Sequence, residues 1–221
     1  MSFEQDWHAW RESREQRLRD PYGWLSITAI HWLTDEPQRF DDVPGEWRQD
    51  DDGPVVDGQR LGPLDEEGVT VTFGDVRAQV ADRDGRTMVR PRRPDSPALG
   101  RYGGTPCYPP DPAWVVHARH DGDEVVFERD GAEHRLEAEV EEDGRLWILF
   151  RDATSGVTTY AAMRQLLTEV PDADGNVEID FNRAYNMPCA YTDFATCPVP
   201  PAQNTLPFPV EAGEQIPRMD P

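Results

Sequence analysis

Apolar and polar residues alternate over short stretches through most of the chain, which is typical of β-strands with one buried face. The clearest stretch is residues 69–73, in which Val69, Val71 and Phe73 fall on one face. Asp-Gly pairs, a strong hairpin signal, recur between such stretches. The pattern therefore predicts a mainly β protein, with sandwich- or barrel-like halves. The other predicted strands are residues 76–80, 114–116, 125–127, 134–140, 146–150 and 177–181.

The first twenty residues show a different pattern, with apolar residues three and four positions apart. This spacing predicts an amphipathic helix that docks on the rest of the protein. Ser2 and Gln5 are placed to form a capping box, and Asp20-Pro21 ends the helix. A second helix is expected at residues 159–167, although Thr158, Thr159 and Tyr160 would suit a strand as well.

Two proline-rich stretches divide the chain. Residues 91–112 are expected to be an ordered connector, and residues 186–221 to be an extended arm that packs on the β core. We refer to residues 186–221 as the C-terminal arm. The predicted organisation is an N-terminal helix (1–20), a first β-half with the connector (21–112), a second β-half (113–185) and the arm.

The charge of the chain is strongly acidic. It has 43 acidic and 22 basic residues, a net charge of −21, and no lysine among the basic residues. Such a surplus repels itself unless salt screens it, which favours a high-salt cytoplasm. An arginine-biased genome or a basic partner are the alternatives. Nucleic acid is not expected as a partner because no basic stripe offsets the negative field.

The longest apolar stretch, residues 24–33, is too short to span a bilayer, and the first residues carry no secretory-signal pattern. We therefore expect a cytoplasmic protein without a membrane partner, whose oligomeric state the sequence leaves open. No cofactor is predicted, because dinucleotide, Walker, GxSxG and HExxH patterns are absent and the histidines show no metal spacing.

The three cysteines, Cys107, Cys189 and Cys197, suggest packing more than chemistry. The last two are separated by seven residues, which is neither a CxxC redox spacing nor a common zinc spacing. As a disulfide they would close a small loop worth roughly 2.5 kcal/mol in the chain-entropy model. We expect them to be buried, reduced and inert, with a disulfide or a metal site as the alternatives.

The last third of the chain resembles a known family. The run FRDATSGVTTYAAMRQLL, the run IDFNRAYNMPCAYTDFATCPVPP, Asn204 and the residues 211–214 are similar to the DUF1684 family, a family of unknown function. Residues 21–25, with the HWL that follows, and residues 111–114 share the resemblance. Met187 departs from the family, whose members usually carry a second proline there. The resemblance implies a shared site around the motif but no activity.

Polar residues crowd the exit of the last predicted strand. Arg183 could hold a carboxylate or phosphate, and Asp180 could act as a base or orient Arg183. Asp180, Arg183 and Tyr185 are the catalytic candidates. The ligand-binding candidates are Arg151, Asp152, Tyr160, Asn182, Arg183, Asn186 and Asn204.

Two functions fit this pattern. The first is a binding protein or enzyme for a small anionic metabolite, with its site at residues 180–197, which we call the 180–197 motif. The second is a non-enzymatic structural or interaction module, in which the same motif only anchors the arm.

Overall fold

The chain begins with the helix that its first residues predict. Helix α1 is Phe3–Leu18, and both halves of the capping box form: Ser2 Oγ accepts from the Gln5 N–H at 3.2 Å, and Gln5 Oε1 accepts from the Ser2 N–H at 2.9 Å. Trp7 and Leu18 are buried, which confirms the expected apolar face. No helix among the residues described is long and apolar enough to cross a membrane.

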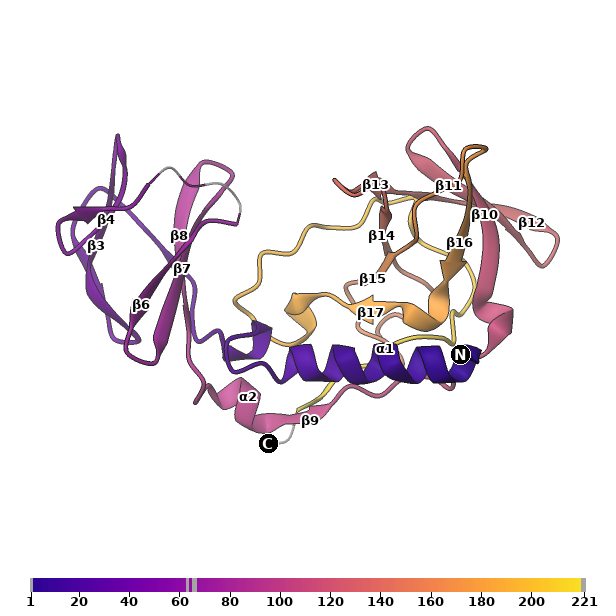
Figure 1. Ribbon diagram of the computed structural model, residues 1–221, viewed down its shortest axis with the longest axis horizontal. Coiled ribbons are helices and arrows are strands. Elements are labelled where there is room, and N and C mark those ends of the chain that lie inside the picture. The colour runs from indigo at the N-terminus through magenta and orange to yellow at the C-terminus, as the bar shows by residue number, and fades with distance from the viewer. Residues whose placement is uncertain (1, 63, 65–66, 220–221) are drawn as a thin grey trace. The chain divides into compact units, whose positions relative to one another are not determined.

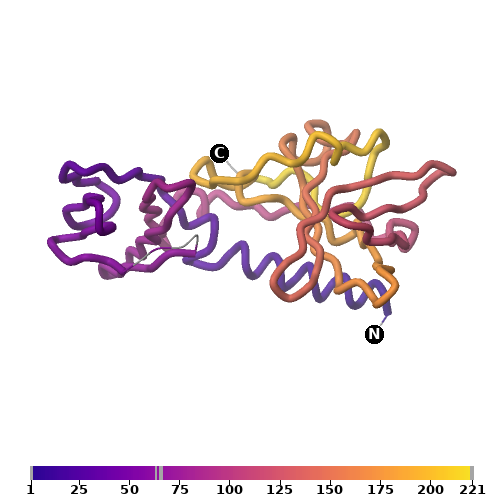
Figure 2. Tube along the Cα trace, turned by 90° about the horizontal axis from the view of Figure 1, so that it is seen from above, coloured from indigo at the N-terminus to yellow at the C-terminus, as the bar shows by residue number. Residues whose placement is uncertain are grey.

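The computed structural model describes residues 2–62, 64 and 67–219, and these divide into two units. Unit 1 consists of residues up to 15, 103–190 and 197–218, and unit 2 consists of residues 16–102, 191–196 and 219 within the described range. The chain therefore leaves unit 1 after Ala190 and re-enters it at Cys197. The colours of Figure 1 and Figure 2 show how the later parts of the sequence join the strands of unit 1.

Unit 2 contains two four-stranded antiparallel sheets. Trp47, Val80 and Val89 are fully buried in its core. One sheet has the order β1 (His31–Trp32), β8 (Arg86–Arg92), β7 (Val76–Arg83) and β6 (Val69–Phe73), and the other has the order β2 (Gln38–Phe40), β3 (Val43–Asp50), β4 (Gly53–Val56) and β5 (Gln59–Arg60). A 3-10 turn, Trp24–Ser26, and the short helix α2, Pro97–Arg101, complete the unit.

Unit 1 contains two further four-stranded antiparallel sheets, labelled in Figure 1. One has the order β12 (Ala132–Glu137), β11 (Glu124–Arg129), β10 (Val115–Asp121) and β16 (Asn176–Asp180). The other has the order β13 (Glu139–Val140), β14 (Leu146–Phe150), β15 (Arg164–Leu167) and β17 (Tyr185–Asn186). The remaining short elements are β9 (Tyr102–Gly104), β18 (Arg218–Met219) and the 3-10 turns Pro112–Trp114, Phe181–Arg183 and Pro188–Ala190. The expectation of a mainly β protein is confirmed.

The C-terminal arm supplies part of the core of unit 1. Leu206, Val210 and Ala212 are buried in the same cluster as Phe150 and Phe181. This cluster also takes the inward faces of the strands on both sides, so the arm completes the core that the two sheets begin.

The helix expected at residues 159–167 is wrong. Arg164–Leu167 is strand β15, which pairs with β14 on one side and β17 on the other. Leu166 is buried in the core, and Arg164 is buried as well. A buried arginine hides the alternation of the strand, because an arginine in a sequence is normally assigned to the solvent face.

Candidate functional site

The polar residues at the exit of β16 are engaged with neighbouring backbone. Asp180 Oδ1 accepts hydrogen bonds from the Asn182 N–H and from Asn182 Nδ2, at 3.0 and 2.9 Å. Asn182 Oδ1 accepts from the Asp111 N–H at 2.9 Å, and Asn182 Nδ2 donates to the Asp111 carbonyl at 3.0 Å. The Asn182 carbonyl accepts from Trp7 Nε1 at 3.0 Å. Asn182 therefore joins β16, the Asp111 turn and helix α1.

Arg183 is partly accessible, with its side chain 34% exposed. Its guanidinium lies between two carboxylates, since Nη2 contacts Asp6 and Nε lies 3.2 Å from Asp180 Oδ2. These two anionic partners outnumber its single positive charge. Arg183 is thus engaged by the protein's own carboxylates in this structure.

Asn186 lies on β17, and its backbone is held by Glu214. Glu214 is fully buried, and its Oε2 accepts the Asn186 N–H at 2.7 Å. Its other oxygen accepts from Arg14 Nε at 3.1 Å and lies 3.5 Å from Arg11 Nη1. The Asn186 side chain donates to the Gln215 carbonyl at 2.8 Å. These bonds join the end of the arm to helix α1.

A buried ion pair lies beneath the arm. Asp152 Oδ2 and Arg164 Nη2 are 2.6 Å apart, and both side chains are at most 1% exposed. Arg164 also donates to the carbonyls of Ala212 and Val210, the latter at 3.0 Å, while Asp152 Oδ1 accepts from the Val210 N–H at 3.3 Å. Burial lowers the pKa of the Arg164 guanidinium, and the charge of Asp152 opposes that effect.

Asn204 attaches the middle of the arm. Its Oδ1 accepts from the Glu137 N–H at 2.7 Å, and its Nδ2 donates to the carbonyls of Glu137 and Leu149 at 2.9 and 2.7 Å. Arg151 takes part through its backbone, which bonds to Asn204 and Leu206. Tyr185 pairs with Gln165 on β15. The Arg14 guanidinium lies over the Tyr185 ring, with its carbon 4.7 Å from the ring centroid.

Sequence reasoning missed two residues that organise this region. Glu214 and Arg164 are both buried and charged, and each bonds to backbone far away in the sequence. Arg164 follows Tyr160 by four residues, and this spacing was interpreted as one face of the predicted helix. Glu214 was noticed only as part of the resemblance.

Cys189 and Cys197 lie together and are not joined by a disulfide. The thiols are hydrogen-bonded, and this bond lowers the pKa of Cys189 to about 7; desolvation raises it in part, and a hydrogen bond with Tyr160 lowers it further. The Tyr160 hydroxyl also donates to the Cys189 carbonyl at 2.8 Å. The expectation of buried thiols is wrong for this pair, since both are half-buried, and the pKa of Cys189 is lowered where a rise was expected. Cys107 is also half-buried, but desolvation raises its pKa to about 12, as was expected of a packing thiol.

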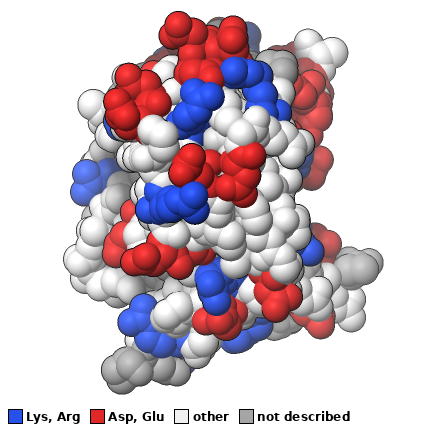
Figure 3. All heavy atoms as spheres, turned by 90° about the vertical axis from the view of Figure 1, so that its left-hand side faces the viewer, with Lys and Arg blue, Asp and Glu red and all other residues white. Residues whose placement is uncertain are grey.

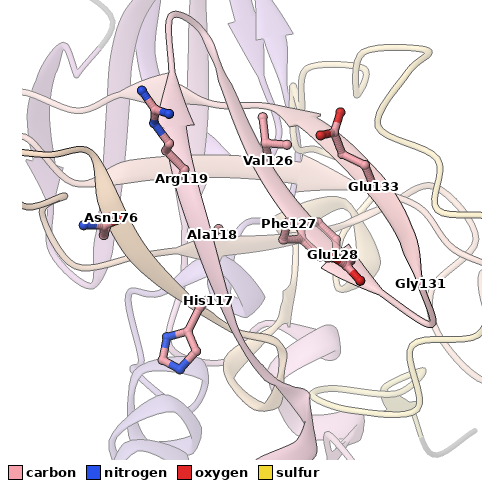
Figure 4. Close-up of a pocket in the computed structure, with 9 residues that line it drawn as sticks. All are labelled: His117, Ala118, Arg119, Val126, Phe127, Glu128, Gly131, Glu133 and Asn176. Atoms are coloured by element: carbon pink, nitrogen blue, oxygen red, sulfur yellow. The ribbon is translucent and has the colours of Figure 1, made fainter.

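A shallow hollow lies on the outward face of the sheet that contains β10 and β11 (Figure 4). Its volume is about 530 Å³. His117 lies 3.5 Å from Glu178 on the neighbouring strand and is exposed to solvent. None of the predicted candidates lines this hollow, whose lining residues are His117, Ala118, Arg119, Val126, Phe127, Glu128, Gly131, Glu133 and Asn176. Among the residues that the structure describes, no group of three or more His, Cys, Asp or Glu side chains could hold a metal ion.

Comparisons with known proteins identify a family but no activity. The model of the family "Protein of unknown function (DUF1684)" matches residues 122–215. No curated protein matches the chain. Among solved structures, it is similar to an uncharacterised protein of Haloarcula marismortui determined by solution NMR. The two share 31% identity over 51% of this chain and 76% of that chain, with a TM-score of 0.44.

Proposed function

We propose that this chain, which belongs to the DUF1684 family of proteins of unknown function, is a non-enzymatic structural or interaction module whose 180–197 motif anchors the C-terminal arm. The proposal rests on the hydrogen-bond partners of the candidate polar side chains. Asn182, Asn186 and Asn204 each bond to backbone brought from elsewhere in the chain. Side chains used in this way fix a fold, because they satisfy buried backbone groups that water cannot reach.

The buried ion pair supports the same interpretation. The contacts of Asp152 and Arg164 reach the backbone at Val210 and Ala212, both in the arm. A catalytic carboxylate or arginine needs an open side toward a substrate, whereas these two side chains are almost fully enclosed. The ion pair therefore suits an anchor better than a reaction.

The alternative is a small anionic metabolite bound at Arg183. Such a ligand would have to displace Asp6 or Asp180 from the guanidinium, because both already contact it. That exchange costs the protein a charge-assisted contact for each carboxylate displaced. The experiments below therefore test ligand binding at Arg183 against anchoring.

We also propose that the module works in the cytoplasm of a high-salt organism. The net charge of −21, with arginine as its sole basic residue type, supports this habitat. Figure 3 shows Asp and Glu side chains interspersed with Arg on one face of the molecule. The same negative field argues against nucleic acid as the partner.

The test separates anchoring from ligand binding. Asn204→Ala should speed hydrogen exchange at arm amides such as those of Leu206 and Val210, while the β10–β11 amides keep their protection. Arg183→Ala should leave the arm amides protected, because Arg183 does not contact them.

A thermal-shift screen of anionic metabolites completes the test. The proposal expects no compound that stabilises the wild-type protein through Arg183. A metabolite that raises the melting temperature of the wild type but not of Arg183→Ala would overturn the anchoring proposal and establish the binding alternative.

A further inference from the structure

Two thiols of unit 1 are positioned for chemistry that arm anchoring does not require. Cys189 lies in the 3-10 turn Pro188–Ala190, and its thiol is hydrogen-bonded to that of Cys197. Both cysteines pack against the same apolar cluster, which contains Leu149, Met163 and Met187. Both remain half-buried, so a small reagent can reach them from solvent.

We propose that Cys189 and Cys197 form a reversible disulfide, with a hydroperoxide as the oxidant and Cys189 as the attacking thiol. The pair constitutes a modification site that lies beyond the anchoring role proposed above. Its basis is the packing of both cysteines against one apolar cluster, with their side chains near enough for a hydrogen bond.

The chemistry proceeds in two balanced steps. The Cys189 thiolate attacks one oxygen of the hydroperoxide, so that an S–O bond forms, the O–O bond breaks, and the leaving oxygen departs as water or an alcohol after taking up a proton. Cys197 then attacks the sulfur of the sulfenic acid, the S–S bond forms, and the hydroxyl leaves as a second water with the proton of Cys197. The two thiols lose two electrons in total, and the peroxide gains them. A small thiol reverses the reaction by two successive exchanges.

The chain itself distinguishes Cys189 from Cys107. The hydrogen bond from Cys197 favours the thiolate of Cys189, which is the nucleophilic form. Cys107 is held as a thiol by burial, with a pKa of about 12. Cys107 therefore serves as the internal control, since it has the same chemical group without the partner.

The disulfide would close the chain at a defined place. Residues 191–196 belong to unit 2, while Ala190 and Cys197 belong to unit 1. A bond between Cys189 and Cys197 therefore joins the points at which the chain leaves and re-enters unit 1. Oxidation would fix the point at which the arm re-enters unit 1 by a covalent bond, whereas reduction would leave it held by packing and hydrogen bonds.

The experiment treats the reduced full-length protein with one equivalent of hydrogen peroxide at neutral pH. The wild type should lose two titratable thiols and two hydrogens from its intact mass, and peptide mapping should place the bond between Cys189 and Cys197. Dithiothreitol should restore both thiols. Cys107→Ala, the matched control, should form the same disulfide at the same rate.

Two variants resolve the order of events. Cys197→Ala should stop at the sulfenic acid of Cys189, detected by labelling with dimedone, and should shift the pH midpoint of Cys189 alkylation upward because the hydrogen bond is lost. Cys189→Ala should leave Cys197 unreactive to the same dose of peroxide.

Three results would overturn the proposal. The first is oxidation of Cys189 to sulfinic acid in the wild type without a disulfide. The second is a reaction of Cys189 no faster than that of Cys107. The third is an alkylation midpoint of Cys189 that does not move in Cys197→Ala. Circular dichroism of each variant before treatment excludes unfolding as the cause of any of them.

Discussion

At the scale of single residues, the most consequential contact is the enclosed pair of Asp152 and Arg164. Taking two charges out of water is costly, and their attraction offsets that cost only when hydrogen bonds complete the site. Arg164 obtains those bonds from arm carbonyls, and Asp152 obtains them from the N–H groups of Thr154 and Val210. Removal of one partner leaves the other charge buried without its counter-ion.

Asp152→Ala is therefore expected to lower the free energy of unfolding by about 3–5 kcal/mol. Arg145→Ala is the control, because it breaks the exposed pair of Arg145 with Asp143 in the same unit and should change the free energy of unfolding far less. Urea unfolding followed by circular dichroism measures both. Equal losses in the two variants would show that burial adds nothing to the pair.

Asp50 gives a prediction about pH. The hydrogen bond from Arg60 lowers its pKa from 3.8 to about 2, against a smaller opposing effect of desolvation. The folded protein therefore holds the carboxylate more strongly than the unfolded chain does. The stability that this contact contributes is complete above the ordinary pKa of 3.8 and is lost as the pH falls toward 2.

NMR titration of the Asp50 carboxyl should thus give a midpoint near 2 in the wild type and a higher one in Arg60→Gln, where Arg48 and the Asp52 N–H still hold the pKa below 3.8. Arg39→Gln removes a different exposed contact, that with Glu46, and should leave the midpoint of Asp50 where it is. A wild-type midpoint of 3.8 would contradict the contact seen between Arg60 and Asp50.

At the scale of elements, the turn at Gly213 decides how the arm passes β17. Its φ is +75°, and a Cβ there would lie 2.4 Å from the Ala184 carbonyl oxygen. Gly131 has the same φ of +75° but nothing within 4 Å of its Cβ position. The two glycines share their backbone conformation and differ only in the space around them.

Gly131→Ala should therefore cost about 1–2 kcal/mol, the usual penalty for alanine in the left-handed region. Gly213→Ala should cost clearly more, because the backbone at Ala184 has to move, and the Glu214–Asn186 contact moves with it. Thermal unfolding of both variants gives the difference. A Gly213→Ala loss no larger than that of Gly131→Ala would mean that the arm adjusts freely at this turn.

An element could be predicted from the sequence where its buried residues are apolar. Residues 69–73 and 146–150 were predicted as strands and are β6 and β14. The apolar residues of β6 pack on one core, and β14 is apolar on both faces because two clusters cover it. Strand β15 could not be predicted, because Arg164 occupies a buried position that only the distant arm makes favourable. Short-range patterns contain no information about such a partner.

The same limit applies to the candidate site. Proximity in sequence correctly placed Asn182 and Arg183 against Asp180. The residues that decide what these groups do, Asp6 and Asp111, are far away in the sequence and were not considered. The sequence therefore indicated which side chains are polar neighbours, while tertiary contacts determine whether they face a ligand or the protein's own backbone.

At the scale of the whole molecule, charge is the dominant property. A net charge of −21 repels itself over distances that salt controls, and the Debye length falls to roughly 3 Å at molar salt. Salt should therefore stabilise the folded protein, because the folded state brings the carboxylates closer together than the unfolded chain does.

The melting temperature should rise steeply between low salt and about 2 M KCl, as measured by differential scanning calorimetry. A non-electrolyte at the same osmolality is the control and should have a much smaller effect. A melting temperature that stays flat across the KCl series would contradict the proposed high-salt habitat.

The division of unit 1 into separate stretches of chain has a consequence for biosynthesis. The two sheets of unit 2 are complete once residue 92 has been made, so they can form while translation continues. Unit 1 cannot, because Arg164 finds its carbonyl partners only when residues 210–214 have left the ribosome. Helix α1, although synthesised first, must wait for Asn182 and Glu214 before its Trp7 and Arg14 find their partners. The nascent chain thus carries helix α1 without its tertiary partners through most of its elongation, a period in which chaperones or early aggregation would act on its apolar face.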